Sequence, residues 1–401
     1  MAHGPEPVRR PRDRRQQIIT SAAKQFRTAG YHNVGITEIA EAVGITSGAL
    51  YRHFGGKQDL LLATVADAID RLEQVWSRPE ATLDELLDAT CALASKGPQV
   101  GVLWARELSH LPAEQQREMR ARLVTAIAPV RSALGTARPD LSADGVDLLL
   151  WATVGVVASA GFYSVRLEAA RQQARLLEAC RAVCTTVPIA AVDPTHEMDP
   201  PSPLGAGLLP ASKQEAILAA ATRLFSTRGY QAVGVDDIGA AAGITGATVY
   251  HHFSNKAAIL TAALTRGVQA MFFDLSGALE SSSTPGEALD KLLRGFVRIS
   301  LEHGQVIGAL RNEAINLPAE ERRPLLQVQA EYVSEWVALV TQHRADVSEP
   351  EALVLVQAAT TAIGTTLAVP HLRRRPTLDA ELVAVGAAIL GLDRTPGAVG
   401  S

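Results

Sequence analysis

The chain has 401 residues, of which 47% are hydrophobic, 20% charged and 4% aromatic. This length suggests two or three domains, and this much apolar material excludes a disordered chain. Alanine and leucine are abundant and no strand-like runs recur, so we expect an all-α fold. The net charge of −4 excludes a surface that is basic all over, although DNA-binding proteins often confine their basic charge to one face.

Basic residues crowd the start of the chain, from Arg9 to Arg27, against the single acid Asp13. We interpret residues 1–13 as a basic arm, and the alternative is a solvated tail. No apolar core with a cleavage site follows, so we expect no signal peptide, and we expect a cytoplasmic protein without a membrane span. The candidate DNA contacts in this region are Arg12, Arg14 and Arg15.

Four helices are predicted after this arm. The spacing of Ile18, Ala22 and Phe26 predicts a one-sided helix that Gly30 ends. Thr37 is the predicted N-cap of a short second helix that ends at Gly44. Thr46 then caps a third helix, which ends before residues 55–56, and a fourth is predicted over 57–76.

The second and third helices form a predicted helix-turn-helix. Gly44 can adopt the positive φ that the tight turn needs, and Ile45 is expected to fill the crevice between the two helices. Only small side chains precede Leu50 in the third helix, so this helix can enter a major groove closely. Its end offers phosphate donors from Tyr51 onward. The alternative is a generic hairpin of helices with exposed polar tips.

The whole arrangement then occurs a second time. Residues 18–57 align without a gap to 217–256 at an offset of 199 (217 − 18), and HLPAE at 110–114 aligns to NLPAE at 316–320 at an offset of 206 (316 − 110). A Pro- and Gly-rich stretch lies between the copies. The predicted domains are a basic arm (1–13), two heads (14–62 and 212–261), two helical bodies (63–187 and 262–393), a linker (188–211) and a tail (394–401).

GITSGALYRHFGGK and GITGATVYHHFSNK resemble the helix-turn-helix signature of the TetR/AcrR family of bacterial transcriptional regulators, with two such units in one chain. The resemblance implies a DNA operator as partner. It implies contacts from Thr37, Thr46, Ser47, Gly48, Ala49, Tyr51, Arg52, His53 and Lys57 in the first head. In the second head it implies Thr245, Gly246, Ala247, Thr248, Tyr250, His251, His252 and Lys256. Asp236 replaces Thr37 there, so we expect weaker binding by the second head unless Asp236 only caps its helix.

Two apolar, small-residue helices are expected over 148–162 and 354–368. The resemblance implies that they join the two copies into an internal pseudo-dimer, so that one chain can act as a monomer. It also implies a pocket for a mostly apolar ligand such as a lipid, an acyl-CoA or a steroid-like compound. Candidate pocket residues are Trp104, Arg106, Glu107, His110, Trp151, Phe162, Tyr163, Phe272, Phe296, Arg311, Glu313 and Trp336. The alternative is that the aromatic residues are ordinary core and the charges a structural pair near the LPAE turn.

No phosphate loop, catalytic signature or metal-spaced Cys/His set is present, so we expect no enzyme, cofactor or metal. The three cysteines are expected to be buried thiols. The predicted function is a sequence-specific DNA-binding regulator, most simply a repressor that a small ligand releases, reading an asymmetric operator with two unlike heads. The alternatives are a ligand-independent DNA-binding regulator and a helical interaction protein whose heads no longer bind DNA.

Overall fold

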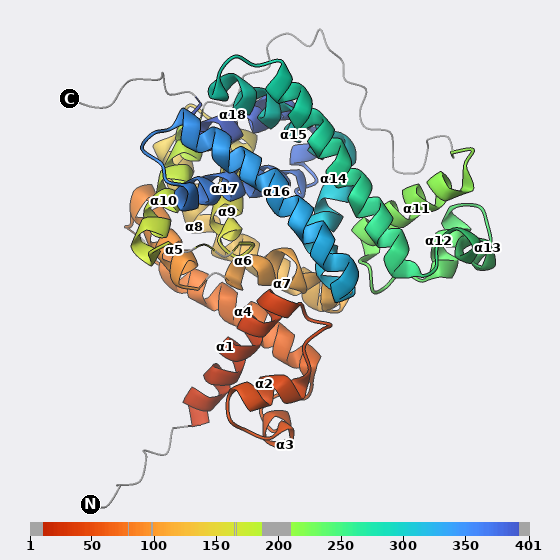
Figure 1. The fold of residues 1–401 in the computed structure, drawn as a ribbon. Helices are drawn as coiled ribbons and strands as arrows, with labels where there is room; N and C mark the ends of the chain where they lie inside the picture. Colours follow the sequence, from red (N-terminus) through yellow and green to blue (C-terminus); the bar gives the residue numbers. More distant parts are fainter. Residues whose placement is uncertain are drawn as a thin grey trace, which may run out of the picture. The chain divides into compact units, whose positions relative to one another are not determined.

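The computed structural model describes residues 11–78, 80–97, 99–163, 165, 167–186 and 210–392, and over these all regular structure is helical (Figure 1). The side chains of residues 11–13 and of Arg311 lie outside the described part. So do most of the predicted arm and linker and the whole predicted tail. Among the described residues, no helix combines the length and apolarity needed to cross a membrane.

The described residues form two compact units, 1–79 with 97–129, and 80–96 with 130–401. The first unit contains the first head and part of its body. Its helices are α1 (Pro11–Ala29), α2 (Ile36–Ala42), α3 (Ser47–Tyr51), α4 (Lys57–Trp76), α6 (Gln99–Ala105), η1 (Glu107–His110) and α7 (Ala113–Ala126). The bounds of α4 are those predicted from sequence.

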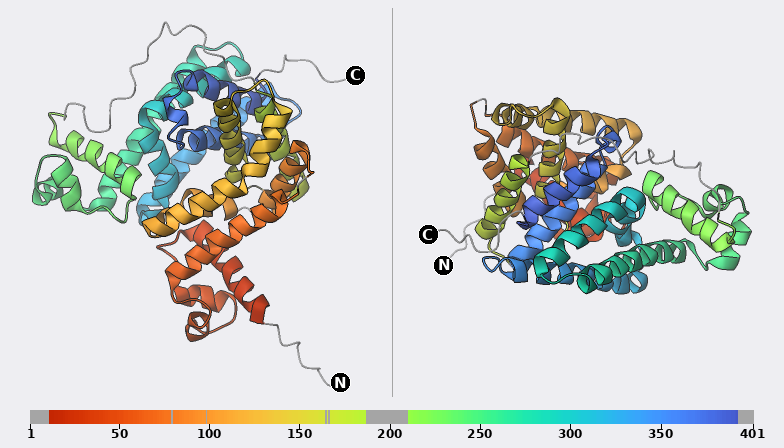
Figure 2. Two further views of the ribbon diagram at one scale, coloured as in Figure 1. Left: turned by 180° about the vertical axis from the view of Figure 1, so that it is seen from behind. Right: turned by 90° about the horizontal axis from the view of Figure 1, so that it is seen from above.

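The second unit holds the rest of the first copy and all described residues of the second (Figure 2). The first copy contributes α5 (Leu83–Lys96), α9 (Ala143–Ser159) and α10 (Ala169–Thr185), while α8 (Ala128–Ala137) spans the boundary between the units. The second copy contributes α11 (Lys213–Arg228), α12 (Val235–Ala241), α13 (Gly246–His252), α14 (Lys256–Glu280), α15 (Pro285–Glu313), η2 (Ala314–Asn316), α16 (Ala319–His343), α17 (Glu349–Leu367), η3 (Leu372–Arg374) and α18 (Leu378–Leu390).

Each head is built on the same buried stripe of its first helix. Ile18 and Phe26 are fully buried on α1, and Ile217 and Phe225 occupy the matching places on α11. These side chains recur at the spacing that turns one helix face inward, as the sequence predicts. The φ angle is +69° at Gly44 and +71° at the matching turn of the second head, so both turns use the conformation that favours glycine.

The N-caps of the second helices differ from the prediction. Gly35, not Thr37, caps α2, and its N–H donates to the Glu38 carboxylate at 2.9 Å. In the second head the cap is Gly234, whose N–H donates to Asp237 at 2.8 Å, so the prediction of a cap at Asp236 is also wrong. The reason is that an acid three residues after the cap reaches back to the cap's N–H and starts each helix two residues earlier than expected.

The third helices begin as predicted. Thr46 accepts a hydrogen bond from Ala49 N at 3.2 Å, and Thr245 accepts one from Thr248 N at 3.3 Å. Ile45, expected to fill the crevice between the two helices, is only half-buried. The third helix is therefore fixed mainly by its cap and by Leu50, which is fully buried.

Helices α9 and α10 of the first copy pack against α17 and α18 of the second, within the second unit (Figures 1 and 2). The closest approach is at Gly155, where a Cβ atom would lie 2.5 Å from Ala362 Cα and 2.9 Å from Thr361 O. Only glycine permits two helix backbones to cross at this distance. Both helices start earlier than the apolar stretches in the sequence indicate, and α9 ends at Ser159, before Phe162.

Replacing Gly155 by alanine tests this crossing. We expect Gly155→Ala to lower the free energy of unfolding by about 1–3 kcal/mol, because the added methyl group has no space. Gly277→Ala on α14 is the matched control, since nothing lies within 4 Å of a Cβ there and alanine is the better helix former. Thermal unfolding of both variants measures the difference, and equal melting temperatures would contradict the close crossing.

Candidate functional site

The third helix of each head exposes the side chains that the sequence marks as DNA contacts. Tyr51 is 54% exposed on α3 and Tyr250 is 56% exposed on α13, which are high values for large side chains. Arg52 and both His251 and His252 are exposed as well. Helices α3 and α13 thus present aromatic and donor groups outward, while Leu50 and Val249 face the head's core.

Serine and threonine hydroxyls at the start of α3 lie together. Ser47 Oγ donates to Thr37 Oγ1 at 3.2 Å, so residues from two helices form one exposed polar group. In the second head the matching residues are Gly246 and Asp236, and a Cβ on Gly246 would collide with the Asp236 carboxylate. The start of α13 therefore carries a negative charge where the start of α3 carries hydroxyls.

Lys57 and Lys256, which occupy matching positions in the two heads, both have partners within their own head. Lys256 Nζ donates to Tyr230 O at 2.9 Å and to Val233 O at 3.0 Å, and it lies 4.3 Å from the centre of the Tyr230 ring. Lys57 Nζ lies 4.4 Å from the Tyr31 ring and 3.4 Å from His32 O. Burial lowers the pKa of both lysines. These two cations thus fix the turn between the first and second helices of each head, besides any contact with DNA.

Two arginines at the start of α1 also pack within the head. Arg14 donates to Val43 O at 2.9 Å, and the Arg15 guanidinium lies 4.9 Å from the centre of the Phe54 ring. Both tie α1 to the helix-turn-helix, an arrangement that the basic run did not reveal. The side chain of Arg12 is outside the described residues.

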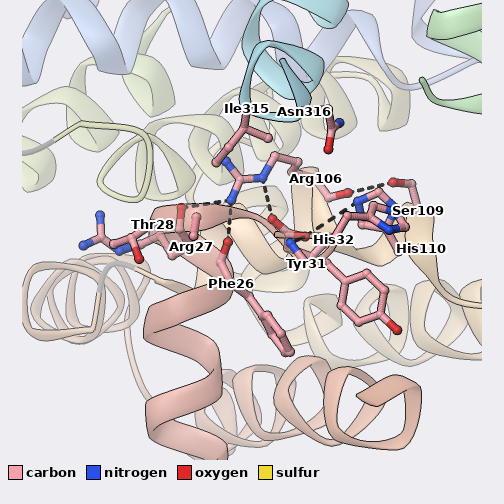
Figure 3. Close-up of polar contacts among 12 residues, drawn as sticks. Phe26, Arg27, Thr28, Tyr31, His32, Arg106, Ser109, His110, Ile315 and Asn316 are labelled. Atoms are coloured by element: carbon pink, nitrogen blue, oxygen red, sulfur yellow. Dashed lines mark hydrogen bonds and ion pairs between the residues drawn. The ribbon is translucent and has the colours of Figure 1, made fainter. Parts of the chain in front are cut away.

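The first unit contains a buried ionic junction between head and body (Figure 3). Arg106 donates to Phe26 O at 2.7 Å and to Arg27 O at 2.9 Å, which are carbonyls of the last turns of α1. It also donates to the fully buried Glu107 at 2.5 Å, and Glu107 in turn accepts from Tyr31 N at 3.0 Å. A cation at the carboxyl end of a helix satisfies free carbonyls and offsets the helix dipole.

Two histidines complete this junction. His32 Nε2 lies 3.1 Å from His110 Nδ1, and the His110 ring stacks on Tyr31 at 5.5 Å. Burial lowers the pKa of His110 to about 4, and the neighbouring charges of His32, Arg106 and Lys57 add to this. Burial raises the pKa of Glu107, against the opposing effect of Arg106. The junction therefore accommodates the neutral form of His110, and protonation of His110 at acid pH opposes it.

The second copy lacks these histidines and the arginine. Gln231, Asn312 and Asn316 stand at the places of His32, Arg106 and His110. Asn316 Nδ2 donates to Glu313 Oε2 at 2.8 Å. Arg106 and Glu107 contact each other near the LPAE turn, as the structural alternative in the sequence analysis describes. The sequence alone did not reveal that Arg106 also contacts the distant helix α1.

The remaining pocket candidates fall into both units. Trp104 belongs to the first, while Trp151, Phe162 and Tyr163 belong to the second. Gln172 Nε2 donates to Tyr163 OH at 3.3 Å. In the second copy, Phe272 lies 5.6 Å from Tyr332, and Trp336 lies 6.0 Å from Phe296, ring centre to ring centre. Over the described residues, no three His, Cys, Asp or Glu side chains lie close enough together to hold a metal ion.

The three cysteines are free and buried, as expected. Cys91 Sγ on α5 lies 3.8 Å from Cys180 Sγ on α10, and Cys184 Sγ lies 3.7 Å from Thr153 Oγ1. Burial raises the pKa of the Cys184 thiol to about 11, which keeps it protonated and unreactive at neutral pH. The cysteines thus pack the first copy's helices together.

The junction predicts a specific dependence of stability on pH. His110 has a folded pKa below its ordinary value of about 6.5, so unfolding takes up a proton in this range and stability falls as the pH drops from about 6.5 to 4. We expect His110→Asn, which introduces the second copy's residue, to reduce this loss by at most about 3 kcal/mol. Thermal unfolding across this range measures it, with His252→Asn at an exposed histidine as control. An unchanged slope in His110→Asn would show that His110 does not cause the acid sensitivity.

Comparisons with known proteins agree with this geometry. The profile described as bacterial regulatory proteins, tetR family, matches residues 18–64 and 217–263. The HTH-type transcriptional regulator HbdR of Aromatoleum sp. (strain CIB) is 32% identical over 111 residues, which cover 26% of this chain and 48% of HbdR. The HTH-type transcriptional repressor KstR2 of Mycolicibacterium smegmatis is 29% identical over 154 residues, covering 35% of this chain and 75% of KstR2.

A solved structure of the ketosteroid transcriptional regulator KstR2 of Mycobacterium tuberculosis is also similar, with 22% identity and a TM-score of 0.39 over 45% of this chain and 95% of that one. The chain spans about half the length of HbdR. Both profile matches coincide with the two helix-turn-helix segments, α2–α3 and α12–α13, together with the helices that flank them. The chain therefore carries twice the helix-turn-helix segment that characterises the tetR family of bacterial regulatory proteins.

Proposed function

We propose that the chain is a sequence-specific regulator of transcription that binds one DNA operator with two non-identical heads. The observation that carries this proposal is the repeated helix-turn-helix with a capped third helix whose Tyr51 or Tyr250 side chain is more than half exposed. Such a helix can lie in the major groove while the hydroxyl and basic groups at its ends bind phosphates. We also propose a cytoplasmic location, because the proposed DNA partner is found there.

The two heads differ where they would face DNA. The first recognition helix begins with Ser47-Gly48-Ala49, and the second begins with Gly246-Ala247-Thr248. Separate family subunits that pair with themselves present two identical helices and read palindromes. Here α9 and α10 pack on α17 and α18 of the same chain, which supports an internal pseudo-dimer. We therefore propose an asymmetric operator whose half-sites lie about one helical turn, roughly 34–36 Å, apart.

The second head binds DNA more weakly in this proposal. The Asp236 carboxylate lies against Gly246 at the start of α13, where it interacts favourably with the helix dipole. The same charge repels a phosphate, whereas the matching Ser47 and Thr37 hydroxyls can donate to one. Arg52 at the end of α3 is His251 in the second head, which removes a further permanent cation.

A mostly apolar small molecule is the effector that we propose, and its binding would release the chain from DNA as it does for a repressor. The support is the aromatic cluster of Phe272, Phe296, Tyr332 and Trp336, because apolar and aromatic walls suit a lipid, acyl-CoA or steroid-like compound. A regulator without an effector and a helical interaction protein are the alternatives. A mobility-shift assay with the gene's own upstream DNA tests for DNA binding, which the interaction protein would lack. A screen for compounds that release the DNA then distinguishes a regulator with an effector from one without.

Truncating the exposed tyrosines tests the heads. We expect Tyr51→Ala and Tyr250→Ala each to raise the Kd for the operator by about five- to tenfold, because each removes one exposed anchor worth about 1 kcal/mol. The rise in Kd should be larger for Tyr51→Ala if the first head binds DNA more strongly than the second. Phe273→Ala on α14, an exposed aromatic residue outside the heads, is the control and leaves Kd unchanged. An unchanged Kd in both tyrosine variants would show that α3 and α13 do not bind the operator through these side chains.

The number of chains on the operator tests the asymmetric reading. We expect one chain per operator and a footprint in which the two half-sites differ in sequence, because both heads come from one molecule. Native mass spectrometry of the complex gives the number, and hydroxyl-radical footprinting gives the half-sites. A strict palindrome occupied by two chains would overturn this part of the proposal.

A further inference from the structure

The repeat allows each contact between the copies to be compared with its counterpart. In the 206-residue register, Gly155 matches Thr361 (361 − 155) and Arg175 matches Glu381 (381 − 175). Helix α9 thus corresponds to α17, and α10 to α18. Replacing each residue by its counterpart shows what would meet if two like copies packed through the same face.

The crossing of α9 and α17 excludes one like pairing by its shape. Gly155 leaves no room for a Cβ atom before Ala362 Cα and Thr361 O of the opposing helix. Two second copies would place Thr361 where Gly155 lies, with a branched side chain directed at the other backbone. Packed helix backbones cannot separate at one point without losing contacts along their length, so this pairing is strongly disfavoured. Two first copies would present glycine on both sides and meet no such clash.

Charges at the end of this face favour the unlike pairing as well. Arg175 Nε lies 3.2 Å from Glu351 Oε1, and Arg344 Nη2 lies 2.9 Å from Glu178 Oε1. Arg344 is only 6% exposed, so its charge depends on the carboxylates of Glu178 and of Asp346, whose Oδ2 lies 2.8 Å away. Removing the partner of a buried charge costs more than the pair itself contributes.

Like pairings break these contacts in different ways. In a pair of second copies, Glu351 would lie opposite Glu381, which takes the place of Arg175. In a pair of first copies, Arg175 would lie opposite Gly145, the counterpart of Glu351. The first arrangement leaves Glu351 without a cross-copy cation, because Glu381 is an acid that is already paired with Arg375, and the second leaves a cation without its cross-copy partner, so both are weaker than the observed arrangement.

We propose that this face, formed by α9, α10, α17 and α18, is an interaction surface selective for unlike copies. It accepts a second copy on a first copy, within one chain or between two chains, and it rejects two second copies. This proposal rests on the internal pairing proposed above and adds its specificity. Consequently, the second copies of two molecules cannot pair with each other through this face.

The test uses the full chain with a protease site inserted between residues 188 and 209. The folded protein is cleaved, unfolded in urea and returned to buffer, so that the halves choose partners again, and native mass spectrometry counts the pairs. Unbiased pairing would give second-with-second pairs about one time in four. We expect them at least about tenfold below that share, with unlike pairs predominant. Second-with-second pairs at the unbiased share would overturn the proposal.

Two variants locate the cause and guard against halves that do not refold. We expect Thr361→Gly to raise the share of second-with-second pairs severalfold, while Thr360→Gly, a half-exposed neighbour on α17, gives the same loss of helix propensity without this effect. In the uncleaved chain, Arg175→Glu and Glu351→Arg should each lower the melting temperature, the latter also because it removes the hydrogen bonds from Ser348 to Glu351. The double variant should lose less than the two single losses added together, and additive losses would remove the electrostatic part of the selectivity. Operator binding by the uncleaved chain is measured separately, so failure of the DNA-binding proposal and failure of the pairing proposal give different results.

Discussion

The crossing of α9 over α17 at Gly155 is the contact on which the second unit depends. Because a glycine lets the two backbones approach, α10 and α18 can close around the crossing and Arg175 can reach Glu351 across the copies. A surface that separate subunits would otherwise leave open is thereby covered inside one molecule. This frees the two heads from being identical, since symmetry no longer requires one sequence to serve both.

The heads have kept their scaffold and changed their polar surface. Phe26 and Phe225 fill the same position in the core, and both Lys57 and Lys256 lie over a tyrosine ring. The exposed ends differ, because Thr37 and Ser47 of the first head are matched by Asp236 and Gly246 in the second. The two positions are neighbours in both heads, since Ser47 donates to Thr37 and the Asp236 carboxylate lies where a Cβ atom of Gly246 would be. At this place the polar surface of the heads thus differs in a contacting pair of residues.

Local features were predictable from the sequence, and contacts between distant residues were not. The period of apolar residues gave the helices, and the hydroxyl of Thr46 gave the start of α3, because each depends on neighbours within one or two turns. The sequence predicted an N-cap at Thr37 instead of Gly35, because threonine is a preferred N-cap residue and lies only two positions later. The burial of Glu107 depends on Tyr31 and Arg106 meeting across the unit, and no short-range pattern records that meeting. The tight crossing at Gly155 likewise needs a partner helix that lies some two hundred residues away in sequence.

The divergence of Gly155 from Thr361 also has a meaning for the history of the molecule. A duplicated gene whose halves still pair with themselves can lose either half and return to a simple homodimer. At this crossing glycine stands in the first half and threonine in the second, so the second half cannot meet its own image there. The single atom that Gly155 lacks therefore makes the second half dependent on the first, whereas the first half keeps the route back to a simple homodimer.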